Sequence, residues 1–208
     1  DFYIPYGEKS GDNYVIETTA GKASDNPLSH PLTLDDYIPF VEYFIIPYLL
    51  WFVFLAVTGA YFFFTNRRDF YRLAAFLCSG MTIFLIVCTI FPNGLNLRPL
   101  TFPRENIFTD LVRMIYSVDT PTNVLPSIHV YNSIGAMAAI AHSTSLKKHR
   151  GVQIGSYVLG ILIIFSTVFL KQHSITDVIA ALAMACMIYP FVYATQEKKE
   201  TKLSQQLI

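Results

Sequence analysis

Residues 40–64 read FVEYFIIPYLLWFVFLAVTGAYFFF, and residues 73–91 read LAAFLCSGMTIFLIVCTIF. The first stretch contains one charged residue, Glu42, and the second contains none. A helix that crosses the bilayer needs about 20 mostly apolar residues. Both stretches meet this requirement, so they predict the fold class: an all-α polytopic membrane helix bundle.

Further apolar stretches cover residues 127–145, 152–170 and 175–195. The first of these is the weakest of the five predicted spans, because His129, Asn132 and Ser133 share one helical face. A lipid-facing helix avoids such residues, so we expect this face to border a polar cavity. A shorter pattern over residues 105–117 has helical spacing and predicts an amphipathic helix on the membrane surface.

The composition agrees with a membrane protein. Of the 208 residues, 53% are hydrophobic and only 14% are charged, with 15 basic residues balancing 15 acidic ones. A disordered chain needs low hydrophobicity and high net charge, and a nucleic-acid binder has a basic excess, so neither class fits. The partners expected are therefore membrane lipids and no nucleic acid. No pattern in the sequence bears on an oligomeric state.

The basic residues give the predicted orientation. With five spans, three basic segments fall on one side of the membrane, which the positive-inside rule makes cytoplasmic. These segments contain Arg67, Arg68 and Arg72, then Lys147, Lys148 and Arg150, then Lys198, Lys199 and Lys202. The loop 92–126 and the turn 171–176 then face outside, and we expect a multi-pass protein of the plasma membrane.

This orientation puts the N-terminus outside, which is unusual without a preceding span. We therefore expect an upstream helix, giving six spans in the full-length chain. The predicted organisation is an extracytoplasmic segment at 1–39, a transmembrane catalytic domain at 40–195 and a cytoplasmic tail at 196–208.

Two histidines lie at the predicted outer ends of spans. His173 and Asp177 are four residues apart, so a fifth span that begins near His173 would stack them on one face. A carboxylate there can accept one imidazole N–H and leave the other nitrogen basic. Ser127 is a good N-cap, and His129 follows it at a helix start that can cradle an anion. A purely structural alternative remains open for each. His173 would be a hydrogen-bonded histidine at a helix end, Ser127 a helix cap, and His129 a water-exposed residue at the rim of the bundle.

Two cations lie at the same predicted depth. Arg98 offers a planar fork suited to phosphate oxygens, and Lys171 supplies a second positive charge. The alternative for Arg98 is a juxtamembrane arginine that reaches the lipid headgroups. On ligand type alone, His129, His173 and Asp177 could also hold a metal ion. We expect no metal and no cofactor.

The order Arg98-Pro99, Pro126-Ser127-x-His129 and His173-x-x-x-Asp177 resembles the type-2 phosphatidic acid phosphatase superfamily. That superfamily also holds lipid phosphotransferases and vanadium haloperoxidases. Its motifs are Lys-x6-Arg-Pro, Pro-Ser-Gly-His and Ser-Arg-x5-His-x3-Asp.

The chain departs from these motifs at three positions. Phe91 stands at the motif lysine, Ile128 at the glycine and Thr167 at the motif arginine, whereas Ser166 matches. Lys171, Arg104 or Arg113 are candidates to replace the missing cations. Reduced motifs of this kind are partly similar to the inositol phosphorylceramide synthase branch.

The resemblance implies a mechanism. His173 attacks phosphorus and becomes phosphohistidine, Asp177 orients it, and His129 protonates the leaving oxygen. Arg98, Ser127 and Lys171 hold the phosphate oxygens of a lipid phosphate or pyrophosphate substrate. The first functional hypothesis is a lipid phosphate phosphatase. The alternatives are a phosphotransferase that moves a phospho-headgroup to a lipid alcohol, and a non-catalytic lipid transporter that keeps the fold.

Overall fold

The computed structural model describes residues 9–10, 13–14, 34–99 and 101–194. The tail at 196–208 and most of residues 1–33 lie outside the described residues. Helices dominate the described part, and its only strands are the short antiparallel pair β1 (Lys9–Ser10) and β2 (Asn13–Tyr14). The fold is thus the expected all-α membrane helix bundle.

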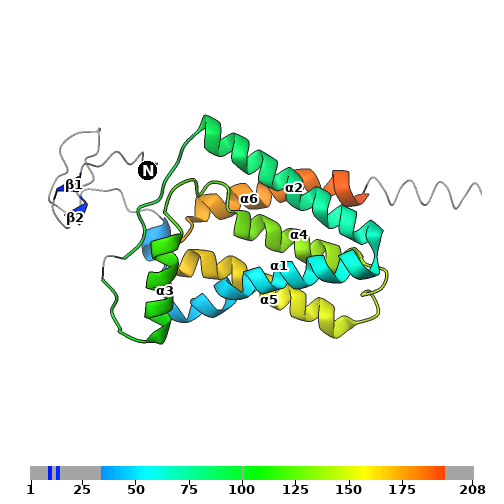
Figure 1. Cartoon of the computed structure of the whole chain (residues 1–208), viewed down its shortest axis with the longest axis horizontal. Helices are drawn as coiled ribbons and strands as arrows, with labels where there is room; N and C mark the ends of the chain where they lie inside the picture. Colours follow the sequence, from blue (N-terminus) through cyan, green and yellow to red (C-terminus); the bar gives the residue numbers. More distant parts are fainter. Residues whose placement is uncertain (1–8, 11–12, 15–33, 100, 195–208) are drawn as a thin grey trace, which may run out of the picture.

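Five helices run side by side and a sixth, α3, lies across one end of the bundle (Figure 1). The helices are α1 (Ile45–Thr65), α2 (Arg67–Ile90), α3 (Ile107–Val118), α4 (Ile128–His142), α5 (Arg150–Phe169) and α6 (Ile175–Tyr189). Short 3-10 turns η1 (Leu34–Tyr37) and η2 (Glu42–Phe44) precede α1, and a π-helical turn η3 (Pro190–Ala194) follows α6.

Among the described residues, four helices are long and apolar enough to cross a membrane: Glu42–Thr65, Arg67–Ile90, Arg150–Phe169 and Ile175–Tyr193. The fifth predicted span, α4, has 15 residues. That length corresponds to about 22 Å, which is shorter than a hydrocarbon core of about 30 Å. This helix is the centre of the bundle, and most of its side chains are buried on every side.

Small residues let the neighbouring helices approach α4 closely. A Cβ on Gly80 of α2 would lie 2.0 Å from the Tyr131 ring of α4. A Cβ on Gly160 of α5 would lie 2.4 Å from the sulfur of Met137. Close approach through glycine is how helices gain packing energy in lipid, where no hydrophobic effect drives them together.

Two details of the predicted organisation are wrong. The expected loop between the first two spans is a one-residue turn, because the Asn66 side chain accepts from the backbone N–H groups of Arg68 and Asp69 and starts α2 there. Arg67, Arg68 and Arg72 therefore belong to the first turns of a helix. The predicted polar face of α4 is also not one cavity wall, since Ser133 is buried and its hydroxyl donates to the His129 carbonyl.

Candidate active site

A pocket of about 200 Å³ opens at the end of the bundle that carries α3. The basic connections α1–α2 and α4–α5 lie at the opposite end of the same helices (Figure 1). The pocket walls come from α2, the α2–α3 loop, the α3–α4 loop, the start of α4 and the α5–α6 turn. The lining residues are Phe84, Arg98, Asp119, Thr120, Thr122, Asn123, Val124, Ile128, His129, Gln172 and His173.

Two loops that are distant in sequence are joined to form one wall. The buried Asn93 side chain accepts from the backbone N–H groups of Val124, at 2.8 Å, and Leu125, at 3.0 Å. The Leu95 N–H donates to the Pro121 carbonyl at 2.9 Å. These bonds bring the segment that carries Arg98 beside the segment that leads into α4.

His173 lies in the turn between α5 and α6, one residue before the helix cap. The Thr167 carbonyl accepts from the N–H groups of Gln172 and His173, which curls this turn back over the end of α5. Lys171 adopts the left-handed conformation, with φ of 54°, to make the reversal. Ser174 caps α6, so His173 is not part of that helix and the expected helical stacking on Asp177 is wrong.

Asp177 still contacts His173, by a different route. It occupies the third position of α6, where its carboxylate accepts from the Ser174 N–H at 2.9 Å in a capping box. The same oxygen, Oδ2, lies 3.5 Å from His173 Nδ1. That separation suits an ion pair but is too long for a good hydrogen bond. Both side chains are buried, so the carboxylate faces the imidazole without intervening bulk water.

His129 is held between two aromatic residues of α1. Its ring lies 4.8 Å from the Tyr48 ring, at 29°, and 4.3 Å from the Trp51 ring, at 45°. The His129 and His173 rings are 5.6 Å apart. In both histidines Nδ1 is buried and, within the described residues, has no hydrogen-bond partner. The Nε2 atoms are therefore the nitrogens available to a molecule in the pocket.

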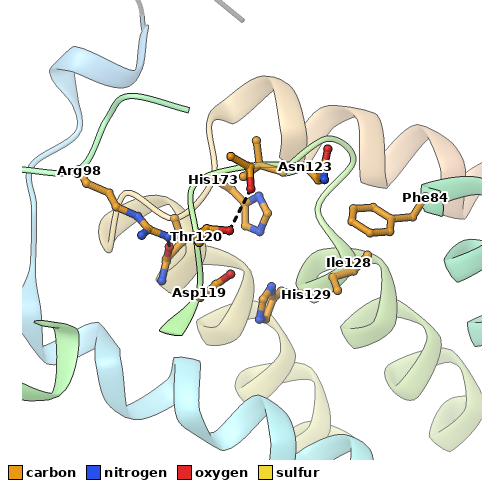
Figure 2. A pocket seen from close by; sticks show the side chains of 11 residues that line it. Phe84, Arg98, Asp119, Thr120, Asn123, Ile128, His129 and His173 are labelled. Atoms are coloured by element: carbon orange, nitrogen blue, oxygen red, sulfur yellow. Dashed lines mark hydrogen bonds between the residues drawn. The ribbon is translucent and has the colours of Figure 1, made fainter. Parts of the chain in front are cut away.

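Arg98 enters the pocket from the opposite side to the apolar Phe84 and Ile128 (Figure 2). Its guanidinium donates to the Tyr116 carbonyl at 3.2 Å and to Gln172 Oε1, and it lies over the Tyr116 ring at 4.4 Å. Partial burial lowers the pKa of Arg98, and the nearby Asp119 carboxylate opposes that shift. An arginine stays charged under both influences, so Arg98 is a fixed cation.

The other predicted phosphate ligands are not on the lining. Lys171 Nζ donates to the Asp35 carbonyl of η1. Burial lowers the pKa of Lys171, and the Asp35 carboxylate opposes that shift. Ser127 is the N-cap of α4, with its Oγ accepting from the Val130 N–H, and its own N–H donates to the Asp177 carbonyl.

Neither Arg104 nor Arg113 replaces the missing motif cations in the pocket. Arg104 pairs with Glu42 at 3.0 Å, and Arg113 pairs with Glu105 and Asp110. The side chain of Thr167, at the motif arginine, bonds to the Ile164 carbonyl. Among the described lining residues Arg98 is the one lysine or arginine. Across all the residues that the structure describes, no group of three His, Cys, Asp or Glu side chains is placed to hold a metal ion.

Several residues that line the pocket or pack on His129 were not predicted from the sequence. Asp119, Thr120, Thr122 and Asn123 form a polar run just before the Pro126-Ser127 motif, and this run was the signal that could have found them. Gln172 adjoins His173 in the sequence. Tyr48 and Trp51 lie inside an apolar span, where nothing distinguishes them from lipid-facing aromatic residues.

A family model described as the PAP2 superfamily matches residues 73–201. This range contains both pocket histidines, Asp177 and Arg98. No curated protein and no solved structure matches the chain. The α1 residues that pack on His129 lie before the matched range.

Proposed function

The chain belongs to the PAP2 superfamily and is a multi-pass membrane protein, and on that premise we propose that it is a lipid phosphate or lipid pyrophosphate phosphatase that works through a phosphohistidine. The observation that carries this proposal is one pocket in which two histidine rings lie 5.6 Å apart beside Arg98. A nucleophile, a proton donor and a fixed cation are the groups that phosphoryl transfer requires.

In the first step His173 Nε2 attacks the phosphorus atom and forms a P–N bond. The P–O bond to the lipid alcohol breaks with its electron pair on the oxygen, and His129 Nε2 gives that oxygen a proton. Burial and the neighbouring His173 lower the pKa of His129, and the negative charge of the bound phosphate opposes that shift and favours the protonated ring. Nδ1 of His173 faces Asp177, so the positive charge that the imidazole gains is met by a carboxylate 3.5 Å away. The lipid alcohol then leaves.

In the second step water is the acceptor. His129 is now neutral and takes a proton from the water molecule while the water oxygen attacks phosphorus. The P–N bond breaks with its electron pair on His173. Inorganic phosphate leaves and both histidines return to their starting states. Arg98 holds the equatorial oxygens, whose charge is greatest in the transition state.

The pocket shape supports a lipid substrate. A volume of about 200 Å³ is below the usual 300–1,000 Å³ of a site that encloses a whole ligand. Phe84, Val124 and Ile128 form an apolar side that a headgroup's first chain carbons can contact. The acyl chains therefore stay in the bilayer while the phosphate enters. The basic residues at the far end of the bundle support an orientation in which that end is cytoplasmic and the pocket faces away from the cytoplasm.

The test is phosphate release from phosphatidic acid in detergent micelles, combined with alkaline quenching to trap radiolabelled phosphohistidine, whose P–N bond is stable in alkali and hydrolyses in acid. We expect His173→Ala to abolish both turnover and labelling. His149→Ala is the matched control, because His149 is an exposed histidine at the other end of the bundle. A His173→Ala protein with wild-type turnover would contradict the proposed nucleophile. A wild-type protein that releases no phosphate would contradict the phosphatase and leave the non-catalytic transporter hypothesis in place.

The small number of cationic side chains in the pocket favours a second candidate function, a phosphotransferase. With Arg98 as the one fixed cation among the described lining residues, the pocket suits a singly charged phosphodiester of the kind that an inositol phosphorylceramide synthase-like enzyme would use. The two candidates separate when a diacylglycerol whose acyl chains differ from those of the donor lipid is added to the assay, so that the product of transfer can be told from the substrate. Transfer of the labelled headgroup to that alcohol supports the transferase, and release to water alone contradicts it.

A further inference from the structure

We propose that Asp119 is a specificity-determining residue that makes the pocket favour phosphate esters with one negative charge over esters with two. This inference rests on the proposed function in either of its forms, because phosphatase and phosphotransferase would bind the phosphate in the same pocket.

Asp119 is held in place by a buried residue. It follows the last residue of α3, and its Oδ2 accepts from the Tyr48 hydroxyl at 3.2 Å. Tyr48 is 2% exposed, and its ring packs on His129. The carboxylate is thereby fixed on the pocket wall next to His129 and on the same side as Arg98 (Figure 2).

The charges on the described lining cancel. Arg98 supplies one positive charge and Asp119 one negative charge, and the remaining polar lining residues are neutral or histidine: Thr120, Thr122, Asn123 and Gln172, with His129 and His173. The Arg98 guanidinium donates hydrogen bonds to the Tyr116 carbonyl and to Gln172, and Asp119 accepts none of them. Asp119 instead acts on Arg98 through its charge.

Because the charges of Arg98 and Asp119 cancel, the pocket should bind monoanions and dianions with different free energies. Removing an ion from water costs free energy that grows steeply with its charge. Hydrogen bonds from the lining side chains can offset that cost for a monoanion. The second negative charge of a dianion is attracted by Arg98 and repelled by Asp119 to a similar extent. The larger desolvation cost of the dianion is therefore not offset. Asp119 is solvent-exposed, so water screens this effect and keeps it moderate.

The decisive variant is Asp119→Asn, which removes the charge while keeping the size and an oxygen that can accept from Tyr48. The substrates are phosphatidic acid, close to a dianion at about pH 8.5, and phosphatidylmethanol, a monoanion, in identical micelles. The measured quantity is the ratio of their kcat/KM values. We expect Asp119→Asn to shift this ratio toward phosphatidic acid by roughly 3- to 10-fold, the size of one charge interaction near a solvated surface.

Two further variants separate charge from other effects. Asp110→Asn removes the same charge from α3, the helix that Asp119 follows, at a site that pairs with Arg113 outside the pocket, and we expect the ratio to stay at the wild-type value. Tyr48→Phe removes the hydrogen bond to Asp119 but keeps the carboxylate charge, so its ratio should also stay close to wild type. If Tyr48→Phe shifts the ratio as Asp119→Asn does, the hydrogen bond rather than the charge sets the preference, and the inference is wrong.

A binding measurement separates this inference from the proposed function. Calorimetry with short-chain phosphatidic acid and short-chain phosphatidylmethanol reports the charge preference without turnover. If the wild-type protein cleaves neither ester, the proposed function fails, and the binding ratio of wild type against Asp119→Asn still decides the role of Asp119. An unchanged ratio in a folded Asp119→Asn protein overturns the inference.

Discussion

Asp177→Asn isolates the electrostatic part of the nucleophile's environment. The Asp177 carboxylate accepts from the Ser174 N–H and lies 3.5 Å from His173 Nδ1. Asparagine keeps an oxygen acceptor, so the helix cap survives the change. What is lost is the negative charge that faces the imidazole when His173 becomes phosphohistidine.

The size of the loss follows from Coulomb's law. Two unit charges 3.5 Å apart interact by about 1 kcal/mol in bulk water and by about 5 kcal/mol at an effective dielectric constant of about 20. Both side chains are buried, but the pocket is open, so the value lies between these limits. We therefore expect kcat to fall by about 10- to 1,000-fold, since each 1.4 kcal/mol is a factor of ten.

The assay is phosphate release from phosphatidic acid, with thermal unfolding measured in the same detergent. Asp177→Asn should lower kcat and leave the melting temperature close to wild type. Asp177→Ala is the comparison, because it removes the cap as well and should also cost about 1 kcal/mol of stability. A kcat for Asp177→Asn within twofold of wild type would refute the role of the carboxylate as the partner of His173.

Three other predictions concern stability and positioning. Lys171→Met should lower the free energy of unfolding by about 1.5–3 kcal/mol, the usual cost of losing a hydrogen bond to a charged group, while KM stays near wild type in the micelle assay. Gly80→Ala should lower the melting temperature, because overpacking against the Tyr131 ring costs about 1–3 kcal/mol. Trp51→Leu should lower kcat more than it raises KM, because the His129 ring loses a face that fixes its orientation.

Each of these variants has a matched control elsewhere in the bundle. Lys147→Met removes an exposed lysine, and Gly59→Ala adds a Cβ that meets nothing within 4 Å. Phe63→Leu changes an aromatic residue of α1 that is 59% exposed and whose ring packs on Phe64 and Phe70. If Lys147→Met, Gly59→Ala or Phe63→Leu changes stability or kcat as much as its partner variant, the contact assigned to that partner is not the cause.

The helices themselves were predictable because a bilayer imposes its requirement on local windows of sequence. The helices α1, α2, α5 and α6 fall close to the predicted spans, and α3 falls close to the predicted amphipathic helix. The helix starts were less predictable, since they depend on individual caps. Asn66 begins α2 earlier than the hydropathy pattern suggests. The helix α6 begins at Ile175, where the predicted span begins, and its Ser174 cap leaves His173 outside the helix.

The site was predictable where motif residues point into the pocket from a helix start or a fixed turn. Arg98, His129 and His173 line the pocket, and Asp177 contacts His173. Lys171 could not be assigned correctly, because its direction depends on a turn with positive φ and on a carbonyl 136 residues away.

The sequence by itself determined that this is a helical membrane protein, which end of the bundle is basic, and which family it belongs to. Those properties depend on hydrophobic length, charge position and motif order, all of which are local in the chain. The tertiary structure decided which polar groups share the pocket. Tyr48 and Asp119 are 71 residues apart in sequence, and Arg98 and Gln172 are 74 apart. Their pairing depends on how helix ends and loops pack, and no local pattern encodes that packing.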